Sequence, residues 1–181
     1  MMGPIGTTAM PAILAGNVKD AWLIRPGKSI GKIYLGEQEA VVLTQCGNTD
    51  PRADYEGMTA MGRKWLIWKG KTGHELDVYT ARGEGDSATH PEQFVRQVRI
   101  ESPTFHTPDG IRVGSTHASI HLKLSEAKLR DQNLRLFDSP ERGIAFEMRR
   151  DSRSNWRCSA IVIHPKGNGV LEEYNPFRAY D

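Results

Sequence analysis

The sequence predicts an α+β protein in which two similar units follow one another along the chain. Each unit is a short helix followed by an antiparallel meander, and the helices are expected to pack on one side of the sheets. Three observations lead to this prediction: a short motif occurs twice, a helix signal follows each copy, and several β-rich runs come after each helix. No segment alternates strand and helix as a parallel nucleotide-binding sheet requires.

The repeated motif reads K-I-Y-L-G at residues 32–36 and G-I-R-V-G at residues 110–114. A Pro/Gly turn signal opens each copy, at residues 26–27 and at residues 108–110. Two such units can bury against each other an apolar face that neither could bury alone. The expected organisation is an N-terminal arm at 1–20, a first unit at 21–102, a second unit at 103–166 and a C-terminal tail at 167–181.

In the first unit, residues 37–46 are expected to form a helix. Acidic residues occupy its first turn, which suits the helix dipole, and Gly47 follows as a C-terminal cap. A polar loop rich in Gly, Asp and Pro comes next, at 48–61. The strands then expected are 64–68, 75–80 and 94–100, the first two joined by a hairpin at 71–73.

In the second unit, Ser115 and Thr116 are expected to cap a helix that runs from residue 117 to about residue 124. Strands are expected after it, as in the first unit, with a polar hairpin loop at 151–155. The expected strands are 134–137, 144–148 and 158–164.

The composition is that of an ordinary globular protein, with 38% apolar and 25% charged residues and a net charge of +2. Lys and Arg are scattered, and the Arg149–Arg150 pair is the one tight cluster, so no nucleic-acid partner is expected. No apolar run reaches the roughly 20 residues that a membrane span needs. Residues 1–16 lack the basic start of a signal peptide and are interpreted as an arm that can dock on a neighbour, which allows an oligomer.

Cys46 and Cys158 lie in different units and leave two interpretations open. Free buried thiols are common, because cysteine is among the most buried residue types. A Cys46–Cys158 disulfide would instead be worth about 4–5 kcal/mol and would indicate an oxidising compartment. Metal binding is not indicated, since neither cysteine belongs to a C-x-x-C pair.

The candidate catalytic chemistry is sparse. His117 and His121 have the i,i+4 spacing of two metal ligands on one helix face, but no acidic third ligand follows as in H-E-x-x-H. There is no G-x-S-x-G motif, and the glycine-rich stretch at 83–86 carries acidic residues that would repel phosphate. Carboxylates on the expected strands, Asp77, Glu101 and Glu147, are interpreted as facing solvent. We expect no catalytic set and no cofactor.

Large aromatic side chains give the better indication of a binding surface. Trp65 and Trp68 fall on opposite faces of one expected strand, so they cannot both belong to one core layer. Trp, Tyr and Arg dominate the energetics of protein interfaces, so an exposed member of the set Trp65, Trp68 and Tyr79 would mark a binding patch. The alternative is that these rings are buried in the core.

The succession of turn, Ile-x-Leu-Gly, short helix and three-stranded meander resembles a unit of the small outer-membrane-assembly lipoproteins. The secreted β-lactamase inhibitor proteins are built from two such units. Residues 32–37 and 110–115 look like the loop that leads into the helix of that unit, and the resemblance covers roughly residues 24–164. The chain departs from the lipoproteins in lacking their lipobox cysteine. The resemblance implies a non-enzymatic, secreted or periplasmic protein that binds another protein through a sheet face, and it assigns no functional residue.

Three functions follow from these patterns. The first is a secreted or periplasmic protein-binding module whose surface includes Trp65, Trp68 and Tyr79. The second is a structural subunit of a virion or cell-surface assembly, with interlocking terminal arms. The third is a metal-dependent hydrolase that uses His117 and His121.

Overall fold

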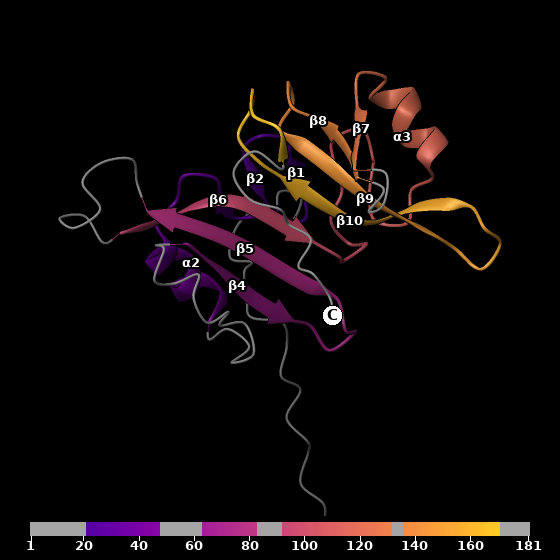
Figure 1. Cartoon of the computed structure of the whole chain (residues 1–181). Helices are drawn as coiled ribbons and strands as arrows, with labels where there is room; N and C mark the ends of the chain where they lie inside the picture. Colours follow the sequence, from indigo (N-terminus) through magenta and orange to yellow (C-terminus); the bar gives the residue numbers. More distant parts are fainter. Residues whose placement is uncertain (1–20, 48–62, 83–91, 132–135, 171–181) are drawn as a thin grey trace, which may run out of the picture.

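The computed structural model describes residues 21–47, 63–82, 92–131 and 136–170 (Figure 1). The N-terminal arm, the loop at 48–61 and most of the C-terminal tail that the sequence predicts lie outside these residues. In the described part, the architecture is α+β, as predicted, and no helix is long and apolar enough to cross a membrane.

The main element is an antiparallel sheet of seven strands in the order β4-β5-β6-β10-β9-β8-β7. A smaller three-stranded sheet lies earlier in the chain. Its strands are β1 (Ile24–Arg25), β2 (Ser29–Ile30) and β3 (Ile33–Tyr34). The main sheet consists of β4 (Arg63–Lys69), β5 (Glu75–Arg82), β6 (Gln93–Ile100), β7 (Lys128–Asp131), β8 (Leu136–Ser139), β9 (Ile144–Arg150) and β10 (Trp156–Ile163).

Each strand expected from the sequence is present, and its ends differ from the expected ones by at most two residues. The small sheet and β7 were not predicted. Strands of two residues are too short to show a period of two, and the mostly polar β7 lacks the apolar alternation that marks a half-buried strand.

The two helices begin and end close to the expected residues. Helix α2 (Glu39–Cys46) ends at Gly47, which has φ 76° and whose N–H donates to the carbonyl of Leu43. Helix α3 (His117–Lys123) begins after Thr116, whose side-chain oxygen accepts a hydrogen bond from the backbone N–H of Ser119 at 3.2 Å. The predicted glycine and threonine caps are both confirmed.

The loops that lead into α2 and α3 make the same pattern of backbone hydrogen bonds, the first to β6 and the second to β10. In each, a glycine N–H donates to a strand carbonyl, and the N–H of that same strand residue donates to the carbonyl after the glycine. The donor–acceptor pairs, each 2.8 Å apart, are Gly36 to Val95 and Val95 to Glu37 for α2, and Gly114 to Cys158 and Cys158 to Ser115 for α3.

The main core lies on one face of the seven-stranded sheet. Alternate strand residues point to this face, and Val42 of α2 and Ile120 of α3 belong to the same cluster, so both helices lie on the same side. The opposite face carries two smaller clusters. These are Trp65, Ile67 and Tyr79 on β4 and β5, and Leu136, Ala145, Val162 and Val170 nearer the other edge.

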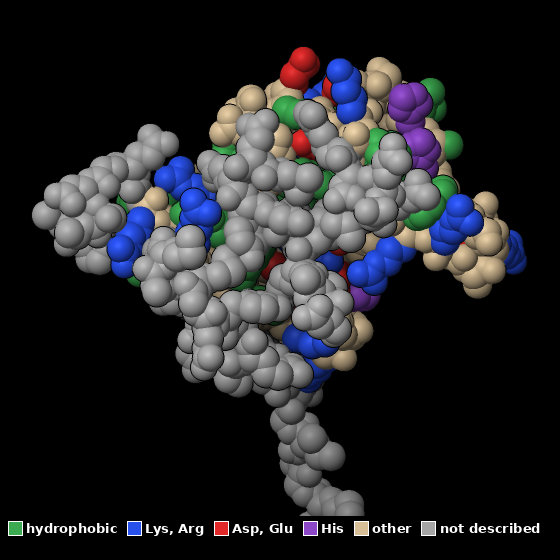
Figure 2. All heavy atoms as spheres, viewed as in Figure 1, with side chains coloured by type: hydrophobic (Ala, Val, Ile, Leu, Met, Phe, Trp, Pro, Cys, Tyr) green, Lys and Arg blue, Asp and Glu red, His purple; other side chains and the backbone are tan. Residues whose placement is uncertain are grey.

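The β9–β10 hairpin extends from the body of the sheet, next to α3 (Figure 1). An isolated bridge between Thr116 and Arg157 joins the start of α3 to this hairpin. Figure 2 shows His side chains gathered over α3 and Lys and Arg side chains on and beside the hairpin.

Two turns meet backbone to backbone at Gly27 and Gly143. The N–H of Gly27 donates to the carbonyl of Gly143 at 3.0 Å, and the N–H of His164 donates to the same carbonyl at 3.1 Å. A Cβ atom on Gly143 would lie 2.4 Å from the His164 carbonyl oxygen and 2.7 Å from the Gly27 Cα. Only glycine allows this approach of the β1–β2 turn to the β8–β9 turn.

We expect Gly143→Ala to destabilise the fold more than Gly36→Ala does. Both glycines have positive φ, 73° and 80°, so each alanine incurs the left-handed cost of about 1–2 kcal/mol. A Cβ on Gly36 meets no atom within 4 Å, whereas a Cβ on Gly143 would clash with the backbone of Gly27 and His164 and push the two turns apart. Urea unfolding of both variants measures the difference, and equal losses would contradict the tight approach of the two turns.

Candidate functional site

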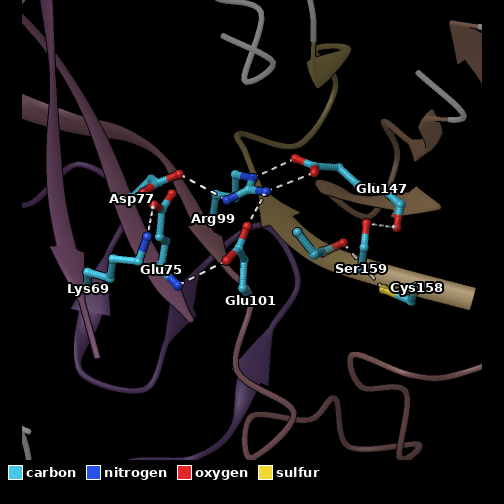
Figure 3. Close-up of polar contacts among 9 residues, drawn as sticks. Lys69, Glu75, Asp77, Arg99, Glu101, Glu147, Cys158 and Ser159 are labelled. Carbon is cyan, nitrogen blue, oxygen red and sulfur yellow. Dashed lines mark hydrogen bonds and ion pairs between the residues drawn. The ribbon is translucent and has the colours of Figure 1, made fainter. Parts of the chain in front are cut away.

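A cluster of charged side chains surrounds Arg99 on the sheet face opposite the helices (Figure 3). Its guanidinium binds Glu147 through two contacts, Nε to Oε1 at 2.6 Å and Nη2 to Oε2 at 2.9 Å. Nη1 donates to Asp77 Oδ2 at 3.0 Å, and Nη2 donates to Glu101 Oε1 at 2.8 Å. One guanidinium thus holds three carboxylates.

Strand register explains how these residues meet. Asp77 of β5 lies directly opposite Arg99 of β6, and Glu101 follows Arg99 by two residues on the same face. Glu147 is on β9, beyond β10, where Ala160 lies opposite it. Because Ala160 is small and fully buried, the Arg99 side chain has room to extend across β10 and reach Glu147.

Three of the four residues of the cluster are buried, and Glu101 is partly exposed. Arg99 is 3% exposed, Asp77 1% and Glu147 3%. Burial alone would lower the pKa of Arg99, but the hydrogen bond and charge of Glu147, followed by the charges of Asp77 and Glu101, raise it above its ordinary value. The guanidinium is therefore permanently charged, and it compensates carboxylates that would otherwise be costly to bury.

This arrangement joins β5, β6 and β9 through one cation. Each nitrogen of the Arg99 guanidinium already donates to a carboxylate. The second oxygen of Glu101 accepts from the backbone N–H of Glu75 at 3.1 Å, which fixes that carboxylate on the neighbouring strand. We interpret the cluster as a link between β5 and β6 on one side and β9 on the other.

The sequence-based interpretation of Asp77 and Glu147 as solvent-facing was wrong, whereas the side chain of Glu101, interpreted in the same way, is 21% exposed. Both faces of the sheet are buried at these strands, so the rule that polar alternation marks an exposed face does not apply. One signal could have revealed part of the cluster, because Asp77 and Arg99 carry opposite charges on neighbouring strands of the expected meander.

A second buried pair, His164 and Asp138, was also missed. His164 Nε2 lies 2.9 Å from Asp138 Oδ1, and Nδ1 lies 3.1 Å from the carbonyl oxygen of Pro165. The other Asp138 oxygen accepts from the backbone N–H of Val170 at 3.0 Å. Both imidazole nitrogens thus lie within hydrogen-bond distance of acceptor oxygens.

The aromatic residues expected to form an exposed patch do not form one. Trp65 is 3% exposed and Tyr79 1%, and their rings pack 5.3 Å apart on the face that carries Arg99. Trp68 points to the other face, where it is half-buried against the main core and its Nε1 donates to the Gly47 carbonyl at 3.2 Å. The prediction that Trp65 and Trp68 face opposite ways is confirmed, but their rings contribute to packing rather than to an open surface.

The histidine pair of α3 is brought together as its spacing predicts. The rings of His117 and His121 are nearly parallel, with centroids 6.0 Å apart, and His117 also packs against Phe137 at 4.4 Å. Among the described residues, no three His, Cys, Asp or Glu side chains come together as a metal site would need.

Cys46 and Cys158 are free, buried thiols of the main core, so the structure shows no disulfide between them. Burial, assisted by the nearby charge of Glu37, raises the pKa of Cys46 to about 11. Burial and then the charge of Glu147 raise the pKa of Cys158 well above its ordinary value. Both sulfurs are therefore unreactive thiols at neutral pH.

The exposed surface with the features of a binding site lies on α3 and the β9–β10 hairpin. Leu122 is 85% exposed, more than any other large apolar side chain among the described residues. His121 and Lys123 flank it and are also exposed. The hairpin adds Arg149, Arg150, Arg153 and Arg157, all of them exposed.

Comparison with known proteins shows no matching family model and no similar curated protein. Two solved structures share part of the backbone course. One is an extracellular protein containing a SCP domain from Bacillus anthracis (TM-score 0.49, 10% identity), which matches over 72% of this chain and 44% of its own length. The other is the uncharacterized protein yfeY from Escherichia coli (TM-score 0.39, 12% identity), which matches over 77% of this chain and 97% of its own.

We expect Arg99→Met to destabilise the protein by about 3–5 kcal/mol, because it leaves buried carboxylates without their cation. Arg99→Lys should lose less, since it keeps the charge but not the forked geometry. The matched control is Arg96→Met on the same strand, with an expected loss below about 1 kcal/mol. Urea unfolding compares the three, and equal losses from Arg96→Met and Arg99→Met would contradict the role of the cluster.

We expect a thiol reagent such as Ellman's to react with neither cysteine in the native protein and with both after denaturation without reductant. Stability contributed by the neutral Cys46 thiol should be fully present below pH 9.0, and it should be lost as the pH rises toward about 11. Absence of reactive thiols in the denatured protein would instead show that a disulfide forms.

Proposed function

We propose that this protein is a non-enzymatic protein-binding module made of two tandem helix-plus-meander units. Its binding surface is the exposed side of α3 and the β9–β10 hairpin rather than the aromatic sheet face expected from the sequence. The observation that carries the proposal is the 85% exposure of Leu122 among exposed basic side chains. Mixed apolar and arginine surfaces are typical of protein interfaces.

The hydrogen bonds at the starts of α2 and α3 support the tandem duplication. The same glycine-to-strand bonds occur at Gly36 and Gly114, the two glycines of the repeated motif. The bridges at the helix caps also correspond, Gln38 with Phe94 and Thr116 with Arg157. In addition, the last strands of the two units, β6 and β10, pair antiparallel at the centre of the sheet, as two equivalent units related by a two-fold rotation would pair.

The placement of functional residues differs between the units. On α2, Val41 is the exposed apolar residue, at 39%, and on α3 it is Leu122, at more than twice that exposure. The buried ion cluster also spans both units but is not repeated. This divergence supports a single binding surface, on the second unit.

A secreted or periplasmic location is proposed only from the resemblance of the repeated unit to secreted and lipoprotein families. Since Cys46 and Cys158 are not bridged, the fold needs no oxidising compartment for its stability.

Site-specific photocrosslinking tests the proposed surface. A photoreactive residue at Leu122 should give a discrete crosslink to a second protein in the producing cells, whereas the matched control at Val41 of α2 should give none. Crosslinks of equal intensity at both positions, or none at Leu122, would contradict the proposal. A crosslink between two copies of the chain would indicate a subunit of an assembly instead.

A further inference from the structure

The β9–β10 hairpin brings four arginines together within nine residues of the chain. We call residues 149–157, with Arg149, Arg150, Arg153 and Arg157, the arginine hairpin. Its one acidic residue is Asp151. In the sequence only Arg149 and Arg150 are adjacent. The hairpin folds the second half of the segment back on the first and so brings Arg157 opposite Arg149.

Register places two of these arginines directly opposite each other. Arg149 of β9 pairs with Arg157 of β10, an arrangement of like charges that destabilises an antiparallel pair. Part of this cost is relieved by Asp151, whose Oδ2 accepts from Arg157 Nε at 2.7 Å. That contact, with two backbone N–H donors, lowers the pKa of Asp151 and keeps it ionised. Arg157 also donates to the Gly114 carbonyl at 3.1 Å.

The other arginines differ in what their guanidinium groups contact. Arg150 lies over the Trp156 ring, 4.9 Å from its centroid, in a cation–π contact. Arg149 and Arg153 are exposed, and within the described residues neither guanidinium has an ion pair or a hydrogen bond. The guanidinium groups of Arg149 and Arg153 are thus free to bind an anion, and Arg149 lies opposite a second arginine, Arg157.

We propose that the arginine hairpin binds an acidic segment of a partner polypeptide, with carboxylates on Arg149 and Arg153 and an apolar side chain against Leu122. This inference rests on the proposed protein-binding function and names the chemistry of the partner. The bridge between Thr116 and Arg157 keeps the start of α3 beside the hairpin.

A peptide ligand fits this surface better than a polyanion or a membrane. The net charge of the chain is only +2, and outside the hairpin Lys and Arg are scattered along the sequence, whereas nucleic-acid binding by counterion release favours basic residues that are gathered together. Helix α3 has seven residues and one strongly exposed apolar side chain, too little apolar surface for an interfacial membrane helix. Arginine forks match the two oxygens of a carboxylate.

Fluorescence anisotropy with a synthetic peptide of about ten residues, alternating Glu and Leu, tests the inference at an ionic strength of about 0.05 M. The wild-type chain should bind it, and the Arg149→Glu, Arg153→Glu double variant should bind at least about tenfold more weakly. The matched control reverses the same number of charges on the β4–β5 hairpin, with Lys69→Glu and Lys71→Glu, and should change the affinity less than about twofold. The milder Arg149→Gln, Arg153→Gln variant should also lose affinity, and circular dichroism verifies that each variant is folded.

Three outcomes would overturn the inference. The first is that the wild-type chain fails to bind the peptide. The second is that the Arg149→Glu, Arg153→Glu variant and the Lys69→Glu, Lys71→Glu control lose peptide affinity equally. The third is that an oligonucleotide with the same number of charges binds more tightly than the peptide. A Leu122 crosslink to a partner, combined with no peptide binding, would leave the binding function intact and remove only the acidic-segment inference.

Discussion

The structure depends on one guanidinium group that connects the two halves of the sheet. Strands β6 and β10 meet through only three aligned residue pairs, whereas β4 with β5 and β9 with β10 align over seven each. Arg99 lies in this short junction and reaches from Asp77 on one side of it to Glu147 on the other. The helices, the small sheet and the hairpins are attached to strands that this junction holds in place.

A sheet buried on both faces restricts where the protein can bind another molecule. Trp65 and Tyr79 lie in a packed apolar cluster. The buried charged residues of the same face, such as Arg99 and Glu147, form ion pairs with one another. Side chains that are free to make new contacts are therefore found at the margin, on α3 and on the hairpin that extends beside it (Figure 2). The residues that hold the sheet together and those of the proposed binding surface are therefore different.

Local signals allowed the elements to be predicted, whereas the chemistry of the sheet needed information from distant residues. The end of α2 at Gly47 and the cap of α3 at Thr116 depend on a few neighbouring residues, so a sequence pattern is enough to locate them. The Arg99 contact with Glu147 requires the strand order, which places β10 between two strands that no local pattern relates. Exposure of Trp65 could not be predicted either, because strand alternation distinguishes the two faces but does not show whether a face is covered.

The register of the central junction also limits how a single half of the molecule could assemble. Arg99 lies opposite Val162, and Val98 and Ile100 lie opposite Ile163 and Ile161. If two copies of the first half paired through β6 in this antiparallel register, each Arg99 would face its own counterpart at the two-fold axis. Each guanidinium would then lack the Glu147 carboxylate that binds it in this chain, whereas the pairing within one chain places Val162 beside Arg99 and Glu147 within its reach.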